Sequence, residues 1–332
     1  MSSSKRIVIF LSVLAFLLPI ISLYHMSVGQ IKVSVSDIQN ALFDYDNSET
    51  SQLLIREFRL PRLIMACIAG AGLSLAGMLM QTLFNNPLAG PYVLGINSGA
   101  SLMVAICLLT GFQFFGTNLG LISSALIGAF AAGMVMMSIT GFLRSQVSLL
   151  LVGLMFGSFT SAIVSLLEAS SGAEQLKSFT LWSMGSLQNV LLEQIPFILL
   201  FFALGIVLCL LIVKPLNLLV LGENAASLLG INTKQTRIIV LVVTALLTGL
   251  VTAFCGPIAF VGLAVPNITR ILLKTQNHGF LILGNLLIGS LFLVLCDIFI
   301  QVLENTVQLP INVLTSMIGA PFVIFVLIRK AK

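Results

Sequence analysis

Side chains that could carry chemistry are few in this sequence and widely spaced. The two histidines, His25 and His278, lie far apart, and the five cysteines fall in apolar stretches without a CxxC pair. Metal ions in proteins are held by grouped His, Cys and carboxylate ligands. The sequence therefore predicts neither a side-chain metal site nor a catalytic set, and we expect the cysteines to be small core residues.

A nucleotide-binding loop is also absent. No lysine in the chain follows a glycine, so the GxxxxGK[ST] loop that cradles phosphates cannot be formed. If ATP drives this protein, we expect another subunit to bind it, and we expect no cofactor on this chain.

Three arginines, Arg56, Arg59 and Arg62, lie together just before the apolar stretch that begins at residue 61. One interpretation is that they anchor a helix at the membrane interface with their long side chains. The other is that they form a docking patch for an acidic partner, because guanidinium groups pair well with carboxylates.

A second polar segment, residues 221–231, has the signals of a short helix. Glu223 suits a helix N-terminus, and Gly230 can end the helix as its C′ residue. Such a helix would present Ala225, Leu228 and Leu229 on one side. An apolar face of this kind either packs within the chain or inserts into a partner's groove.

The elements that must position these residues are apolar helices. Of the 332 residues, 58% are hydrophobic and only 8% are charged, whereas soluble domains carry about 25% charged residues. This composition excludes a soluble enzyme, a disulfide-stapled secreted domain and a disordered chain. The long unbroken apolar runs also argue against an outer-membrane barrel.

We therefore predict an all-α polytopic membrane protein with about ten transmembrane helices joined by short outer and cytoplasmic helices. The predicted apolar segments are 7–26, 61–84, 91–111, 118–142, 147–167, 195–213, 236–254, 257–272, 280–299 and 311–328. The eighth begins at Gly256-Pro257 and contains Pro266, which predicts a broken or partial span. The whole chain, 1–332, reads as one permease-like membrane domain.

The distribution of charged residues predicts which loops lie on each side of the membrane. With the N-terminus inside and ten spans, eleven of the sixteen basic residues lie inside, while nine of the eleven acidic residues lie outside. This is the positive-inside pattern, with both termini cytoplasmic. It puts the arginine cluster outside and the 215–236 loop inside. In the outer loop, 29–58, Ser36 to Gln39 matches a capping box and predicts a short helix.

Several motifs together resemble the membrane subunit of iron-siderophore, haem and vitamin B12 ABC importers. They are Arg59-Leu60-Pro61-Arg62, Gly70-Ala71-Gly72, Asn86-Pro87-Leu88-Ala89, Trp182-Ser183-Met184-Gly185-Ser186, Leu221-Gly222-Glu223 with Ala226 and Leu229-Gly230, Gly256 to Arg270 with Gly262 and Pro266, Leu309-Pro310, and Gly319-Ala320-Pro321. The resemblance covers residues from about 30 to 328.

The resemblance implies a type II importer permease in a bacterial or archaeal cytoplasmic membrane. Its partners would be the lipid bilayer, a second permease copy or paralogue, two cytoplasmic P-loop ATPase subunits and an extracytoplasmic binding protein, with no nucleic acid. The cargo would be an iron chelate, haem or a cobalamin-like compound.

The resemblance also assigns roles to residues. Arg59 and Arg62 would grip the binding protein, with Arg56 beside them. Gly222, Glu223, Ala226, Leu229 and Gly230 would form the ATPase-coupling loop. The cytoplasmic gate region would include Asn86, Pro87, Arg144, Ser145, Gln146 and Ser148. Gly262, Pro266, Arg270, Pro310 and Pro321 belong to the family's structural motifs.

The chain departs from the family pattern at three places. Gln301 stands where an arginine often follows the span-nine aspartate, here Asp297; Asn267 replaces a histidine; and Asn312 replaces a glycine.

The main rival function is an ion-coupled secondary transporter that needs no ATPase. Such proteins place carboxylates or broken helices at midmembrane, and Asp297 is the one carboxylate suited to that role.

Overall fold

The computed structural model consists of helices and their connections, and it describes residues 3–331 except 47, 112–116, 141, 143–145 and 305. No strand occurs among these residues. The elements are α1 (Ser3–Ser27), α2 (Val35–Phe43), α3 (Thr50–Leu54), η1 (Ile55–Arg59), α4 (Leu60–Leu83), η2 (Pro91–Leu94), α5 (Ile96–Thr110), α6 (Thr117–Thr140), α7 (Gln146–Ser170), α8 (Ala173–Ser183), η3 (Leu192–Gln194), α9 (Ile195–Leu211), α10 (Val213–Leu219), α11 (Glu223–Leu228), α12 (Thr233–Cys255), α13 (Val261–Leu273), α14 (His278–Leu303) and α15 (Ile311–Ala331).

Each of the ten predicted apolar segments coincides with a helix. Within the described part of the chain, seven helices are long and apolar enough to cross a membrane, and the shorter apolar helices α5, α13 and α15 account for the other three segments. The predicted all-α membrane architecture is confirmed.

Helices α4 and α12 form the core of the molecule. In the most apolar part of the span 50–83, which includes α4, 89% of the residues are buried, and in that of α12 83% are buried. The corresponding shares are 11% in α1 and 17% in α7. Glycines let α4 touch its neighbours: a Cβ at Gly77 would lie 1.6 Å from the Gly262 carbonyl oxygen in α13, and one at Gly70 would lie 2.1 Å from that of Gly289 in α14. Small residues thus allow backbones to meet without water between them.

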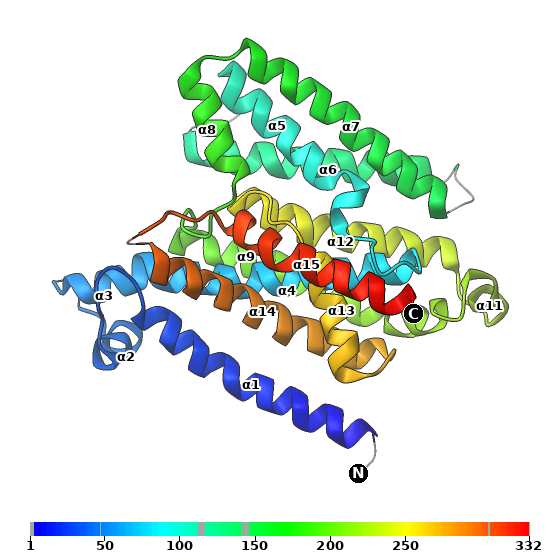
Figure 1. The fold of residues 1–332 in the computed structure, drawn as a ribbon, viewed down its shortest axis with the longest axis horizontal. Coiled ribbons are helices and arrows are strands. Elements are labelled where there is room, and N and C mark those ends of the chain that lie inside the picture. Colours follow the sequence, from blue (N-terminus) through cyan, green and yellow to red (C-terminus); the bar gives the residue numbers. More distant parts are fainter. Residues whose placement is uncertain are drawn as a thin grey trace.

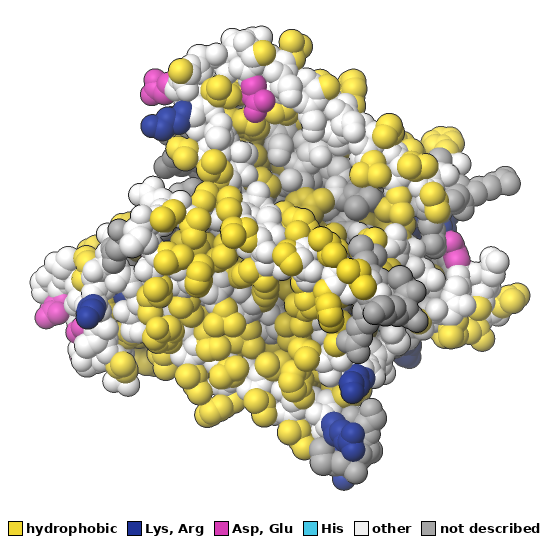
Figure 2. All heavy atoms as spheres, in the orientation of Figure 1, with side chains coloured by type: hydrophobic (Ala, Val, Ile, Leu, Met, Phe, Trp, Pro, Cys, Tyr) yellow, Lys and Arg dark blue, Asp and Glu magenta, His cyan; other side chains and the backbone are white. Residues whose placement is uncertain are grey.

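The two ends of the bundle differ. Both chain termini and α11 lie at one end, whereas α2 and α3 lie at the other (Figure 1). Hydrophobic side chains cover the middle of the face seen in Figure 2, and charged side chains gather near its rim. This distribution is what a membrane-spanning bundle requires, because a lipid-facing surface cannot hold exposed charge cheaply.

The eighth predicted segment is a broken span, as its glycine and prolines indicate. Residues 256–260 are not helical, and α13 has only 13 residues. Neighbouring elements satisfy the freed backbone: Ser186 N donates to Cys255 O (2.8 Å), and Ala259 N donates to Asn312 Oδ1 (2.9 Å). Asn312, one of the departures from the family pattern, therefore holds this segment in place.

Two other predicted motif prolines belong to the last span. Pro310 accepts hydrogen bonds from Val313 N and Leu314 N at the start of α15, and Pro321 lies inside that helix. Pro266 lies inside α13.

The outer-loop helix exists, but the predicted register of its cap was wrong. Helix α2 begins at Val35, and its capping box joins Ser34 to Asp37, two residues earlier than the Ser36–Gln39 match. The Asp37 carboxylate accepts from both the amide (3.0 Å) and the hydroxyl (2.6 Å) of Ser34. These bonds favour the charged form and lower the pKa of Asp37.

Candidate functional site

The end of the bundle with α2 and α3 holds a buried ion pair that joins α4 to α14. Arg62 donates from Nε to Asp297 Oδ2 and from Nη2 to Asp297 Oδ1, both at 2.8 Å. The Asp297 side chain is 3% exposed and that of Arg62 is 13% exposed. A bidentate arginine–carboxylate pair at such depth fixes the two helices in register.

Two more side chains complete this cluster. His25, at the end of α1, places Nε2 2.7 Å from Asp297 Oδ2. Gln301 donates from Nε2 to the same oxygen at 3.1 Å and lies 2.8 Å from His25 Nε2. Gln301 thus occupies the position of the family's arginine, but its amide faces inward to Asp297. We call His25, Arg62, Asp297 and Gln301 the Asp297 cluster.

Arg59 is engaged in a different way. Its Nη1 donates to Met26 O at 2.5 Å and its Nη2 donates to Ile31 O, and the residue is 8% exposed. It therefore ties the end of η1 to the last turn of α1 and to the segment that follows α1. Arg56 lies with its guanidinium 4.2 Å above the Tyr45 ring and is partly exposed.

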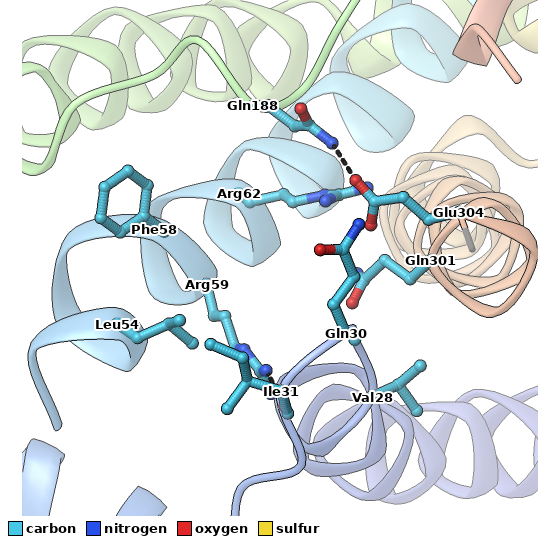
Figure 3. Close-up of a pocket in the computed structure, with 11 residues that line it drawn as sticks. Val28, Gln30, Ile31, Leu54, Phe58, Arg59, Arg62, Gln188, Gln301 and Glu304 are labelled. Carbon is cyan, nitrogen blue, oxygen red and sulfur yellow. Dashed lines mark hydrogen bonds between the residues drawn. The ribbon is translucent and has the colours of Figure 1, made fainter. Parts of the chain in front are cut away.

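A cavity of about 340 Å³ opens beside these arginines, lined in part by Arg59, Arg62, Gln301 and Glu304 (Figure 3). Gln188, from the loop after α8, donates to Glu304 Oε1 at 3.3 Å across it. Arg62 also borders a larger neighbouring cavity of about 650 Å³, which runs between the 184–189 loop and the 307–311 segment. Arg59 and Arg62 thus line a cavity at this end of the bundle, whereas Arg56 is not among its lining residues.

At the opposite end, α11 is a small helix with an exposed apolar tip. Leu228 is 89% exposed and Leu229 is also exposed, while Ala226 is fully buried. Arg237 donates to Glu223 Oε1 at 2.6 Å and fastens the helix to α12. Ala226 and Glu223 therefore anchor α11, and the two leucines face outward.

Two glycines define α11. Gly222 has φ 99° and ψ 152°, and Gly230 has φ 86°, both in regions that side chains avoid. Gly230 N donates to Ser227 O (3.0 Å) and Ile231 N donates to Ala226 O (3.1 Å). This is the Schellman pattern, and it confirms Gly230 as the C′ residue.

The predicted gate region is only partly described. Arg144 and Ser145 lie outside the described residues, as does the side chain of Gln146, and Ser148 lies in the first turn of α7. The Asn86-Pro87 turn is well defined: Asn86 Oδ1 accepts from Leu88 N (2.9 Å), and Pro87 O accepts from Asn267 Nδ2 (2.9 Å). Asn267 thereby ties this turn to α13.

Arg270, a predicted motif residue, is partly buried in α13. Its Nη1 donates to Gln81 Oε1 at 2.5 Å, and Gln81 Nε2 donates to Leu263 O at 3.1 Å. Arg270 and Gln81 thus cross-link α13 and the last turn of α4.

Comparison with known proteins decides what this bundle is. The FecCD transport family matches residues 17–329. The chain belongs to this family. It is 32% identical over 329 residues to the hemin transport permease HmuU of Yersinia pestis, which covers 96% of the chain and 95% of the relative. It is 33% identical over 286 residues to the vitamin B12 import permease BtuC of Salmonella paratyphi A, which covers 86% of each.

A solved structure agrees along nearly the whole chain. An inward-facing metal-chelate type ABC transporter superposes with a TM-score of 0.85 at 30% identity, over 97% of this chain and 99% of that chain. The FecCD protein described here is therefore a multi-pass membrane permease of the ABC importer class, as the sequence resemblance predicts.

The sequence did not reveal the Asp297 cluster. His25 and Asp297 are 272 positions apart, and no local spacing relates them. One signal was available: a histidine and an aspartate inside apolar helices need partners, because an unpaired polar group in a membrane is costly.

Proposed function

We propose that this FecCD protein is the transmembrane subunit of an ATP-driven importer. It would take a metal chelate or cobalamin-like compound from an extracytoplasmic binding protein and release it into the cytoplasm by alternating access. Two permease copies or paralogues would form the path, and two separate ATPase subunits would supply the energy. The named functions of HmuU and BtuC support this cargo class.

The observation that carries the proposal is the exposed tip of α11. Leu228 is 89% exposed on this short, doubly anchored helix, so the described residues leave its side chain almost uncovered. Apolar helix faces of this kind bind in grooves, and the ATPase would provide that groove. Ala226 and the Arg237–Glu223 pair would transmit a push on the tip to α12.

We assign the opposite end to binding-protein docking through Arg56, Arg59 and Arg62. Arg62 uses Nε and Nη2 for Asp297, which leaves Nη1 for a carboxylate on the partner. Held side chains are suited to docking because they lose little freedom on binding.

The rival ion-coupled mechanism would need Asp297 to bind and release an ion. That carboxylate already accepts from Arg62, His25 and Gln301 within the described part of the chain. A carboxylate so occupied is better suited to holding helices than to carrying ions.

The test uses two large apolar side chains that are almost equally exposed, one at each end of the bundle. Leu228→Glu places a charge on the α11 tip, and Phe43→Glu does so on α2, where Phe43 is 88% exposed. We expect the ATPase to copurify with the wild type and with Phe43→Glu, but not with Leu228→Glu. We expect cells with Leu228→Glu to lose uptake of the labelled compound that the wild type imports, tested with hemin, ferric citrate, ferric hydroxamate and cobalamin. If Leu228→Glu retains the ATPase and imports normally, α11 is not the coupling element.

A further inference from the structure

A buried polar chain begins at α10, directly before α11. Asn217 Oδ1 in α10 accepts from the backbone N of His278 at 2.8 Å and lies 2.9 Å from His278 Nδ1. His278 is the first residue of α14 and is fully buried. Because an amide oxygen only accepts, Nδ1 must carry the imidazole proton, and Nε2 must accept.

The next step reaches α4. His278 Nε2 lies 2.9 Å from Thr82 Oγ1, so the threonine hydroxyl is the donor. The same hydroxyl also lies 2.9 Å from Met78 O. A hydroxyl has one proton, so it can serve either the imidazole or the carbonyl at a given moment.

From Thr82 the chain continues to α13 and the turn after α4. Arg270 Nη2 donates to Thr82 Oγ1 at 3.3 Å and its Nη1 donates to Gln81. Asn267, one turn earlier in α13, holds the Pro87 carbonyl. When Thr82 donates to His278, hydrogen bonds run from α10 to α13, and α13 holds the 84–90 turn.

The first link is close to the ATPase-facing tip. Only residues 220–222 separate α10 from α11, and Leu221 N and Gly222 N donate back to Leu218 O and Leu219 O of α10. A displacement of α11 must therefore act on α10 within a few residues.

We infer that the Asn217–His278–Thr82 link transmits the displacement of α10 and α11 to α13 and the 84–90 turn. Asn217 and His278 are positioning residues, because they make α10 move with the ends of α4 and α13 that they contact. The inference rests on the proposed function for its biological meaning. Its physical content, that this link sets the stability of the 84–90 turn, does not depend on an ATPase.

A purely structural role predicts something different. Any buried hydrogen bond supports the fold, so its loss would loosen the bundle wherever the bond lies. The matched control is Ser74→Ala, which removes the buried bond from Ser74 Oγ to Asn285 Oδ1 (2.6 Å) between α4 and α14. That bond does not include α10.

The first experiment is hydrogen exchange on the purified full chain in nanodiscs. We expect Asn217→Leu to speed exchange of the amides in 84–90 and in the last turn of α13 about fivefold, as for the loss of about one net hydrogen bond. Asn217→Asp, which keeps the acceptor oxygen, should restore the wild-type rate, and Ser74→Ala should leave these amides unchanged. The inference is overturned if the change stays within α10 and α11, or if Ser74→Ala has the same effect.

The second experiment measures coupling in the complex with its ATPase, as the ratio of chelate imported to ATP hydrolysed. Asn217→Leu should lower that ratio about fivefold or more while ATP hydrolysis persists, because the variant loses the same hydrogen bond between α10 and α14. A variant that is merely unstable would lose both activities together. Should the wild type import nothing, the proposed function fails while the exchange experiment still decides the link.

Discussion

At the scale of single residues, the arginines at the α2–α3 end stabilise the structure in addition to any docking role. Arg62 binds Asp297, and Arg59 binds two backbone carbonyls, that of Met26 in the last turn of α1 and that of Ile31 after α1. A charge reversal at either position would break these bonds, so lost uptake in such a variant would not identify a docking site.

Replacing Arg62 and Asp297 together by neutral residues separates the structural role of Arg62 from its docking role. Arg62→Gln alone leaves the buried Asp297 charge poorly compensated and should cost about 3 kcal/mol of stability. Arg62→Gln combined with Asp297→Asn removes both charges and should recover most of that loss, measured as the thermal unfolding midpoint in detergent. The docking assignment predicts that the recovered double variant still binds the binding protein weakly. Normal binding by the double variant would show that Arg62 is structural only.

Local helix ends were predictable from the sequence, whereas the partners of buried polar side chains were not. Glu223 at the start of α11 and Gly230 as its C′ residue were predicted correctly, because the signals for a short helix are local. The partners of His25, Asp297, Arg270 and His278 come from helices far apart in the chain, so they depend on packing that no local pattern encodes.

At the scale of elements, the positions of the long apolar runs were sufficient to predict the ten apolar helices. The sequence also predicted the broken span: Gly256 and Pro257 lie in the non-helical segment 256–260, whereas α13 accommodates Pro266 within the helix. The wrong cap of α2 has a simple cause: Ser34 and Ser36 both offer hydroxyls, and only the reach of the Asp37 side chain selects the first.

The α4 crossing gives a direct test of helix packing. Gly77→Ala would put a Cβ 1.6 Å from the Gly262 carbonyl oxygen, whereas Gly72→Ala on the same helix would meet its nearest side chains at 3.7 Å. We expect Gly77→Ala to force α4 and α13 apart and abolish recovery of monodisperse protein. Gly72→Ala should be tolerated, with a gain of up to about 1 kcal/mol in helix propensity. Equal size-exclusion profiles for the two variants would contradict the crossing.

At the scale of the whole molecule, charge asymmetry predicts an orientation with both termini and α11 in the cytoplasm. Four of the five native cysteines are buried and Cys67 is partly buried, so added cysteines can report the topology. In intact spheroplasts, a membrane-impermeant maleimide should label Phe43→Cys and should label Leu228→Cys only after lysis. The reverse pattern would invert the assignment of partners to the two ends.

The central claim is that energy comes from a separate ATPase acting on α11. The most direct measurement is chelate accumulation in proteoliposomes that hold the full chain, with the binding protein on the α2 side and ATP supplied on the α11 side. We predict accumulation only when the ATPase is present and ATP is hydrolysed, with no change when ionophores collapse the ion gradients. Accumulation by the chain alone, driven by a pH or sodium gradient and unaffected by ATP, would contradict the account.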